Sequence, residues 1–342
     1  MEQIVANPYQ VGGMIRDSAK FVGRQREIRE ILGCVANLGS LSVIGERRIG
    51  KSSLLRQIVK TGRQRLSDPA ATHEFFYLNM QPIESAEEFY RCACEEIAGA
   101  AAQPGDADQE RVYTKYDLKS AIADRKVVLC LDEFEQAIDA DFGAEFFHVL
   151  RDLAQSNHLA LVVATQLPLS QIYQQHEELT SGFPNIFVQL RLGELTPDEA
   201  RELVAMPRNG FRFNEEEIEN ILKIAGNHPY WLNCACAKAY EARRAGKTDF
   251  GEIKSGLNEV RKLYQSTVGP DFELPTIQSS STGKWHSGRR DPNAPLRQAL
   301  ILILIALAIG GFSALASNLL GMILAFILLA ASLLLVLLQA FK

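Results

Sequence analysis

Residues 45–52 read Gly-Glu-Arg-Arg-Ile-Gly-Lys-Ser, and this segment restricts the fold of the chain more than any other. It lies between a short apolar run at 41–44 and a helical pattern that begins at Lys51. The two glycines let the backbone turn so that successive N–H groups face an anion, and the N-terminus of the following helix adds positive potential. The sequence therefore predicts a strand–loop–helix unit that binds phosphate groups.

We expect this loop to bind ATP together with Mg²⁺. Lys51 is expected to reach the β- and γ-phosphates and to act in catalysis, and the Ser52 hydroxyl is expected to bind Mg²⁺. A chance match in a glycine-containing turn is the alternative, and the elements predicted on both sides of the loop argue against it. The predicted nucleotide-binding residues of this loop are Gly45, Glu46, Arg47, Arg48, Ile49, Gly50, Lys51, Ser52 and Ser53.

A second apolar segment, at 127–131, ends in two carboxylates. The first is Asp132, and an Asp at the end of a buried strand can hold Mg²⁺, so we predict it as a metal ligand. The second is Glu133, which is placed to orient or deprotonate an attacking water, so we predict it as a catalytic residue. A solvated acidic turn is the alternative for an isolated Asp-Glu pair.

Two further catalytic candidates come later in the chain. Thr165 ends the apolar segment 159–165, where its hydroxyl could bind the water or the γ-phosphate; a purely structural threonine is equally compatible with this position. Arg151 lies on the preceding helical segment and is a candidate arginine finger for a neighbouring subunit, with a solvated helical arginine as the alternative.

Apolar segments alternate with helical patterns over the first part of the chain, which is typical of a parallel sheet covered by helices on both faces. After Leu195 only helical patterns follow, and they begin at the helix-start signal Thr196-Pro197. The strands are predicted at 41–44, 75–79, 127–132, 159–165 and 186–192.

The predicted fold class is α/β: a P-loop NTPase αβα sandwich with a parallel sheet, a small helical lid domain and a transmembrane helical hairpin. The corresponding divisions of the chain are residues 1–195 for the ATPase domain, 196–265 for the lid, 266–295 for a flexible linker and 296–341 for two transmembrane helices.

These motifs resemble those of the AAA+ ATPases, and more narrowly the STAND class of signalling ATPases, over about residues 7–265. Residues 7–27 are similar to the lead-in that packs around the adenine, which implies that Val22 and Gly23 contact the nucleotide. The segments GERRIGKSS and LCLDEFE are similar to the phosphate loop and the Walker B segment. Residues 226–230, Gly-Asn-His-Pro-Tyr, resemble the nucleotide-sensing lid motif, which implies that His228 and Pro229 contact the nucleotide.

Residues 298–341 contain no charged side chain. As one helix they would be about 66 Å long, far more than the hydrocarbon thickness of a bilayer, so two spans joined by a tight turn fit better. Basic residues flank the two spans on one side. We therefore expect a membrane protein whose ATPase domain and both termini lie in the cytoplasm; a buried core helix or a packed soluble hairpin is the alternative.

Together these features predict a membrane-anchored ATPase of slow turnover that acts as a signalling switch, whose nucleotide state controls oligomerisation or partner binding in a stress or antiviral response. The hairpin would be an anchor or a membrane effector. A constitutive ATPase for a secretion or assembly machine and a nucleotide-binding scaffold are the alternatives. We expect a lipid bilayer, a homo-oligomer and a protein partner or trigger. The 36 basic residues are scattered along the chain and are outnumbered by 41 acidic ones, so we expect no nucleic-acid partner.

Overall fold

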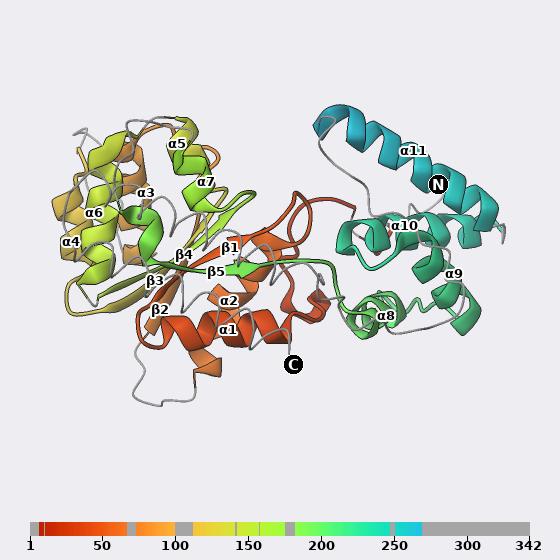
Figure 1. Ribbon diagram of the computed structural model, residues 1–342. Coiled ribbons are helices and arrows are strands. Elements are labelled where there is room, and N and C mark those ends of the chain that lie inside the picture. The colour runs from red at the N-terminus through yellow and green to blue at the C-terminus, as the bar shows by residue number, and fades with distance from the viewer. Residues whose placement is uncertain are drawn as a thin grey trace, which may run out of the picture. The chain divides into compact units, whose positions relative to one another are not determined.

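The computed structural model describes most of the chain before residue 269 (Figure 1). The chain divides into two units, Met1–Ile277 and Gln278–Lys342, and all described residues belong to the first. The predicted transmembrane helices, and the predicted linker beyond Val268, lie outside the described residues. None of the described helices is long and apolar enough to cross a membrane. The described residues are 7–9, 11–66, 73–99, 112–140, 142–156, 158–174, 182–246 and 250–268.

A five-stranded parallel sheet forms the centre of the region before Leu195. Its strand order is β2–β3–β4–β1–β5, and every neighbouring pair is parallel. Strand β4 therefore separates β1, which leads into the phosphate loop, from β3, which ends in Asp132. The five predicted strands are confirmed with small shifts at their ends: β1 Ser40–Ile44, β2 His73–Asn79, β3 Lys126–Asp132, β4 Leu159–Thr165 and β5 Phe187–Arg191.

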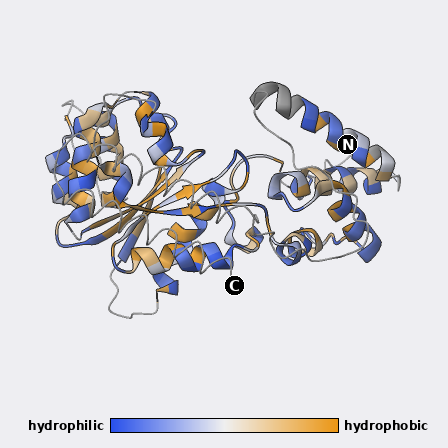
Figure 2. Ribbon diagram, in the orientation of Figure 1, coloured by the Kyte–Doolittle hydropathy of each residue, from blue (hydrophilic) through white to orange (hydrophobic). Residues whose placement is uncertain are grey.

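Helices cover both faces of this sheet. Helices α1 (Gln25–Val35) and α2 (Lys51–Arg65) pack on one face, and α3 (Ala86–Ala98), α4 (Lys115–Ile122), α6 (Gly143–Gln155) and α7 (Leu169–Gln174) pack on the other. Figure 2 shows hydrophobic residues along the strands and mixed colours on the helices. Short helical turns at η1 (Ser18–Lys20), α5 (Gln136–Asp139) and η3 (Phe183–Ile186) are too brief to show a period in the sequence.

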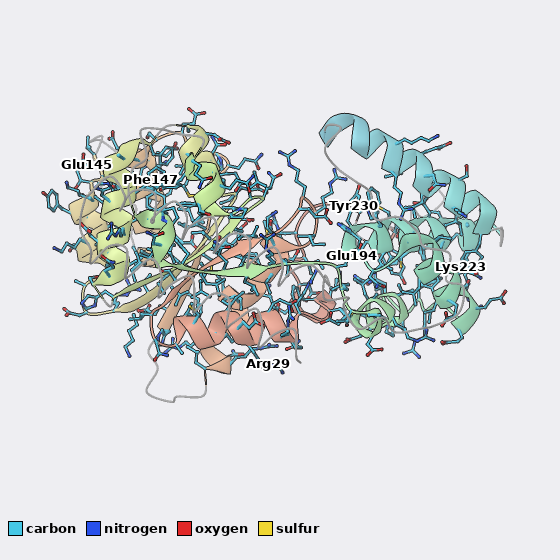
Figure 3. All side chains as sticks on the ribbon, viewed as in Figure 1. Arg29, Glu145, Phe147, Glu194, Lys223 and Tyr230 are labelled. Carbon is cyan, nitrogen blue, oxygen red and sulfur yellow. The ribbon has the colours of Figure 1, made fainter. Side chains whose placement is uncertain are left out.

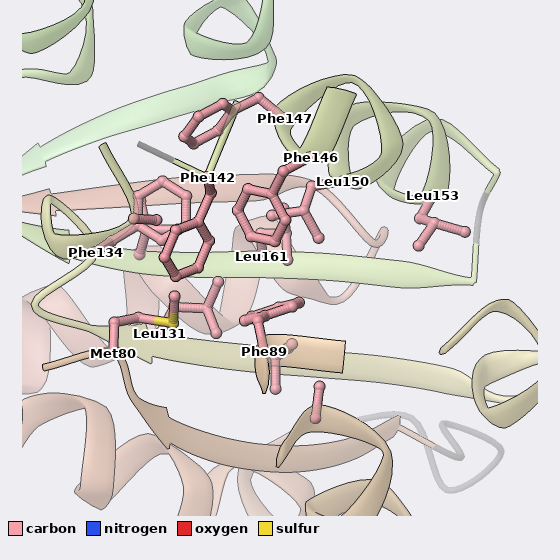
Figure 4. Close-up of a cluster of buried hydrophobic side chains, with 14 of the residues drawn as sticks. Met80, Phe89, Leu131, Phe134, Phe142, Phe146, Phe147, Leu150, Leu153 and Leu161 are labelled. Atoms are coloured by element: carbon pink, nitrogen blue, oxygen red, sulfur yellow. The ribbon is translucent and has the colours of Figure 1, made fainter. Parts of the chain in front are cut away.

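Alternate residues of the inner strands pack into opposite layers. On β3, Leu129 belongs to the cluster with α3 and α6, whereas Cys130 belongs to the cluster with α1 and α2. Helix α6 is amphipathic, because Phe147 is buried and the Glu145 side chain is exposed (Figure 3). Aromatic rings fill the first layer, where the centroids of Phe89 and Phe146 are 4.9 Å apart (Figure 4). Burial on both faces explains why these strands read as continuous apolar runs.

The described residues from Pro197 to Val268 are mostly helical, as predicted, and the last helix ends at Val268 rather than at the predicted lid boundary of 265. Thr196 and Glu199 form a capping box that begins the first helix, and Asn214 and Glu217 form another that begins the second. Trp231 is buried in the core of this part. Its helices are α8 (Pro197–Ala205), α9 (Glu215–Ala225), α10 (Pro229–Arg244) and α11 (Phe250–Val268).

The carboxyl ends of β1, β3 and β4 meet at one edge of the sheet. Ile44 is in register with Thr165, and the Gly45 N–H donates to the Thr165 carbonyl at 3.2 Å. The Phe134 N–H donates to the Ala164 carbonyl at 3.0 Å, which joins the loop after β3 to the end of β4. The phosphate loop and the predicted acidic pair therefore share the edge where open α/β sheets bind ligands.

Candidate nucleotide site

The loop between β1 and α2 wraps around the side chain of Lys51. Its Nζ donates to the carbonyl oxygens of Gly45, at 2.7 Å, and Glu46, at 3.1 Å. Gly50 precedes the helix with a φ of 106°, a left-handed conformation that glycine adopts readily. A Cβ at Gly45 would lie 2.8 Å from the Leu192 carbonyl oxygen, so this glycine permits close approach of the chain after β5.

Lys51 lies among carboxylates although it is only 5% exposed. Burial lowers the pKa of Lys51, and the negative charges of Glu133, Glu135 and Asp132 oppose that decrease. The loop after β3 thus brings its acidic residues to the lysine of the phosphate loop, although the two are far apart in sequence.

Asp132 lies at the end of β3 with its carboxylate held on both sides. The Tyr77 hydroxyl donates to Oδ2 at 2.8 Å, and the Glu133 N–H donates to Oδ1 at 3.2 Å. Burial and, after it, the Asp132 charge raise the pKa of Tyr77, so its hydroxyl remains a donor. Carboxylate oxygens accept several bonds each. Asp132 and the Ser52 hydroxyl therefore fit the oxygen donor set that Mg²⁺ takes together with substrate phosphates.

Glu133 and Glu135 occupy different positions in the loop after β3. Glu133 has a φ of 52°, which is uncommon for a glutamate, and its side chain lines the cavity described below. Oε1 of Glu135 accepts a hydrogen bond from Gln166 Nε2 at 3.1 Å, and Gln166 Oε1 accepts one from Arg47 Nε at 3.2 Å. This chain of contacts ties the phosphate loop to the ends of β3 and β4. The sequence interpretation missed Gln166, although it directly follows a predicted site residue.

Thr165 and Arg151 do not reach the cavity. Thr165 is fully buried, and its hydroxyl donates to the Leu167 carbonyl at 2.7 Å, so the hydroxyl supports a turn. Arg151 lies on α6 and contributes nothing to the cavity lining of its own chain. An arginine finger would act on a neighbouring subunit, and that role stays a prediction.

A cavity of about 280 Å³ opens beside the phosphate loop. The lead-in, the loop and the helical part of the chain all contribute to its walls. The predicted residues that line it are Val22, Arg48, Ile49, Gly50, Lys51, Ser52, Ser53, Glu133 and Pro229. The other predicted residues lie outside the lining: Gly23, Gly45, Glu46, Arg47, Asp132, Arg151, Thr165 and His228.

Arg24 connects the lead-in to the phosphate loop and to the start of the helical part. Its Nη2 donates to the carbonyl oxygens of Ile49, at 3.2 Å, and Gly193, at 2.7 Å, and its Nη1 donates to that of Glu194 at 3.3 Å. The Arg24 backbone N–H donates to Glu199 Oε1 at 2.6 Å. The sequence contains Arg24 within the predicted lead-in, but nothing in its spacing indicates these contacts.

The neighbouring lead-in residues also have specific contacts. Gly23 has a φ of 73°, and a Cβ there would lie 2.7 Å from Glu199 Cδ, so only glycine fits without strain. Val22 is buried, and the Ile15 N–H donates to Ser53 Oγ at 2.9 Å. The lead-in is thereby fixed against both α2 and α8.

The turn before α10 faces the phosphate loop. His228 caps this helix and Pro229 is its first residue, which agrees with a sharp helix start. His228 is 2% exposed, and its Nε2 lies 3.1 Å from Glu46 Oε1. Tyr230 and Asn233, which the sequence interpretation missed, line the cavity with Pro229. Figure 3 labels Tyr230 near the start of α10, and its ring lies under the Arg48 guanidinium at 4.3 Å.

Solved structures share this fold at low sequence identity. A Walker-type ATPase of Pyrococcus abyssi is 15% identical with a TM-score of 0.55, over 75% of this chain and 77% of that chain. The ORC2 protein of Aeropyrum pernix, in ADPNP–ADP complexes, is 13% identical with a TM-score of 0.57, over 74% of this chain and 71% of that chain. None of the curated proteins compared with the chain matches it.

The model of the Novel STAND NTPase 1 family matches residues 14–249, a span that holds the phosphate loop, the acidic pair and the turn before α10. The chain belongs to this family. The predicted P-loop ATPase of STAND type is thereby confirmed, as is the prediction of an ATP-hydrolysing enzyme. As a member of the Novel STAND NTPase 1 family it binds nucleotide.

Proposed function

We propose that this Novel STAND NTPase 1 protein is a nucleotide-controlled switch anchored to a membrane. The observation that carries the proposal is the cavity whose walls come from the phosphate loop, the lead-in and the turn before α10. A nucleotide in this cavity contacts all three segments, so its binding and hydrolysis change how the helical part is held against the sheet. Nucleotide state is then coupled to conformation, as a switch requires.

Hydrolysis is assigned to the residues at the edge of the sheet. The N–H groups of the loop and Lys51 bind the phosphates, and Glu133 accepts a proton from the water that attacks the γ-phosphorus while the bond to the bridging oxygen breaks. Ser52 and Asp132 would hold Mg²⁺, which neutralises charge on the phosphates when bound. Gln166 donates to Glu135 and accepts from Arg47, and so links the loop that carries Glu133 to the phosphate loop.

Membrane attachment is assigned to residues 296–341, because residues 298–341 within them contain no charged side chain. Two helices in a hairpin would leave the ATPase part and both termini in the cytoplasm, where ATP is available.

We further propose that the ATP-bound form assembles into a homo-oligomer in which Arg151 contacts the nucleotide site of the neighbouring subunit, and that a protein trigger controls this step. The excess of acidic residues supports a function without nucleic acid, although one solved structure of the same fold, ORC1 of Aeropyrum pernix (18% identical, TM-score 0.50, 70% of this chain and 66% of that chain), is a complex with DNA.

The test is ATP turnover of the full chain against protein concentration, with and without lipid vesicles. A switch predicts slow turnover that rises with concentration and vesicle binding, and loss of nucleotide binding in Lys51→Ala. High turnover at every concentration would indicate a constitutive ATPase.

The topology of the hairpin is tested with a tag placed after Lys342. The tag is expected to be protected in vesicles with the cytoplasmic face inside, and labelling from outside would contradict that topology.

A further inference from the structure

Arg208 is a buried cation in the turn between α8 and α9, and the sequence does not single it out. It is 5% exposed. Its backbone N–H and carbonyl pair with those of Phe211, each at 2.9 Å, across Asn209 and Gly210, which both have positive φ. The backbone therefore fixes the position of Arg208 closely.

The Arg208 guanidinium lacks hydrogen bonds for part of its donor set. Its Nε and Nη2 are removed from solvent and have no hydrogen-bond partner among the residues that the structure describes. The guanidinium carbon lies 5.3 Å from the centroid of the Tyr9 ring. By contrast, Arg243 in the same helical part is half exposed and bonded to Glu217. Buried donors without acceptors cost free energy, so a partner that supplies acceptors at this point is favoured.

Arg208 also lines the cavity that contains the phosphate loop. It lies at the apolar wall, because the lining residues Val22, Leu195 and Leu203 belong to the same hydrophobic cluster as Tyr9, over which the guanidinium sits. The phosphate-binding residues of α2 form another part of the lining. An apolar wall with a few placed polar groups is the usual environment of a nucleoside rather than of phosphates.

We propose that Arg208 binds the nucleoside half of ATP and ADP, donating to acceptor atoms of the base or ribose. The proposal rests on the proposed nucleotide site. A purine offers ring-nitrogen acceptors and the ribose offers hydroxyl oxygens, whereas arginine offers only donors, so the two are complementary. The bound nucleotide then joins the α8–α9 turn to the phosphate loop, which gives the helical part a nucleotide-dependent attachment separate from the turn before α10.

The test compares wild type with Arg208→Met, which keeps an unbranched stem and removes the guanidinium and its charge, and uses Arg212→Met as the control because Arg212 is exposed in the same segment. The affinity for ADP is measured by calorimetry, and thermal unfolding is followed without nucleotide. Arg208→Met is expected to bind ADP about 10-fold or more weakly. Its unfolding temperature without nucleotide is expected to equal or exceed that of wild type, because an unpaired buried charge has been removed. Arg212→Met is expected to match wild type in both.

Inorganic tripolyphosphate serves as a phosphate-only competitor, and its affinity is expected to be unchanged in Arg208→Met. An equal loss for tripolyphosphate and ADP would overturn the nucleoside assignment. Wild-type ADP affinity together with a lower unfolding temperature would make Arg208 a structural residue and overturn the proposal. Failure of wild type itself to bind ADP would instead contradict the proposed nucleotide site.

Arg208→Lys covers the case in which the methionine variant does not fold. Lysine keeps the charge but cannot offer two parallel donors from a planar group. This variant is expected to bind ADP more weakly than wild type while its affinity for tripolyphosphate stays the same. Undiminished affinity for ADP in Arg208→Lys would overturn the proposal.

Discussion

His228 Nε2 lies 3.1 Å from Glu46 Oε1, so the helix cap before α10 touches the phosphate loop directly. His228 Nδ1 accepts the Tyr230 N–H at 3.2 Å. We therefore assign the ring proton to Nε2, which faces the carboxylate of Glu46. The pair connects the turn before α10 to the phosphate loop, across the 182 positions that separate residue 46 from residue 228.

The first prediction is that this pair is energetically coupled. In a double-mutant cycle of Glu46→Gln and His228→Asn, the coupling free energy of unfolding is expected to be about 1 kcal/mol, because the two side chains are in contact. Denaturant unfolding of the four proteins measures it. Glu46→Gln combined with Arg201→Met, whose partners lie on α9, serves as the control and is expected to be additive. Additive effects in the His228 cycle would show that the contact carries no coupling.

The second prediction is that hydrolysis requires Glu133 but not a nearby exposed acidic residue. Glu133→Gln is expected to lower kcat at least about 100-fold, because the amide cannot accept a proton from water, while the affinity for ADP is retained. Asp139→Asn, on the exposed end of α5, is expected to leave kcat unchanged. Single-turnover hydrolysis distinguishes the two. A Glu133→Gln protein with wild-type turnover would remove Glu133 from the reaction.

The third prediction contrasts Thr165 with the residue that follows it. Thr165→Val removes a buried hydrogen bond to Leu167 and is expected to lower the free energy of unfolding by about 1 kcal/mol with little effect on kcat. Gln166→Ala is expected to lower kcat about 10-fold at nearly unchanged stability, because it frees both Arg47 and Glu135. If Thr165→Val lowered kcat more than Gln166→Ala does, Thr165 and not Gln166 would be important for hydrolysis.

The sequence predicted the parts of the site that follow from local pattern. The glycine spacing at 45–50 and the apolar run ending at Asp132 each signal their own structure within a few residues. Contacts made across the fold leave no such signal. Arg24 donates to the carbonyl groups of residues 49, 193 and 194, which are far from it in sequence. Arg208 lines the cavity from the turn between α8 and α9. Whether a side chain at the end of a strand faces the site also depends on the turn that follows the strand. The Thr165 hydroxyl, for example, donates to the Leu167 carbonyl in that turn.

The fourth prediction concerns pH. Burial is the main cause that raises the pKa of Glu135 above 4.5, and Glu133 adds to it, while Gln166 and Lys51 oppose it. The folded protein therefore binds this proton more tightly than the unfolded chain. As pH rises from the ordinary glutamate range through the raised pKa, this residue makes the free energy of unfolding fall.

Glu135→Gln is expected to remove that decline, so the variant gains stability relative to wild type as pH rises through this window. Urea unfolding at a series of pH values from acidic to neutral measures the difference. Glu216→Gln, at an exposed position of α9, is the control. A stability difference between Glu135→Gln and wild type that does not change with pH would contradict a raised pKa at this residue.

The last prediction concerns Arg24, whose guanidinium holds together three carbonyl groups from two distant parts of the chain. Arg24→Met leaves those acceptors without their donor in a largely buried position, so the free energy of unfolding is expected to fall by about 3 kcal/mol. ADP affinity is expected to fall as well, because the Ile49 carbonyl belongs to the phosphate loop. Arg26→Met is the matched control, since the Arg26 side chain is 69% exposed and its ion pairs, with Glu27 and Glu30, leave its own guanidinium in solvent. Denaturant unfolding and calorimetry measure the two effects, and a loss of stability without a loss of ADP affinity would show that Arg24 supports the fold but not the phosphate loop.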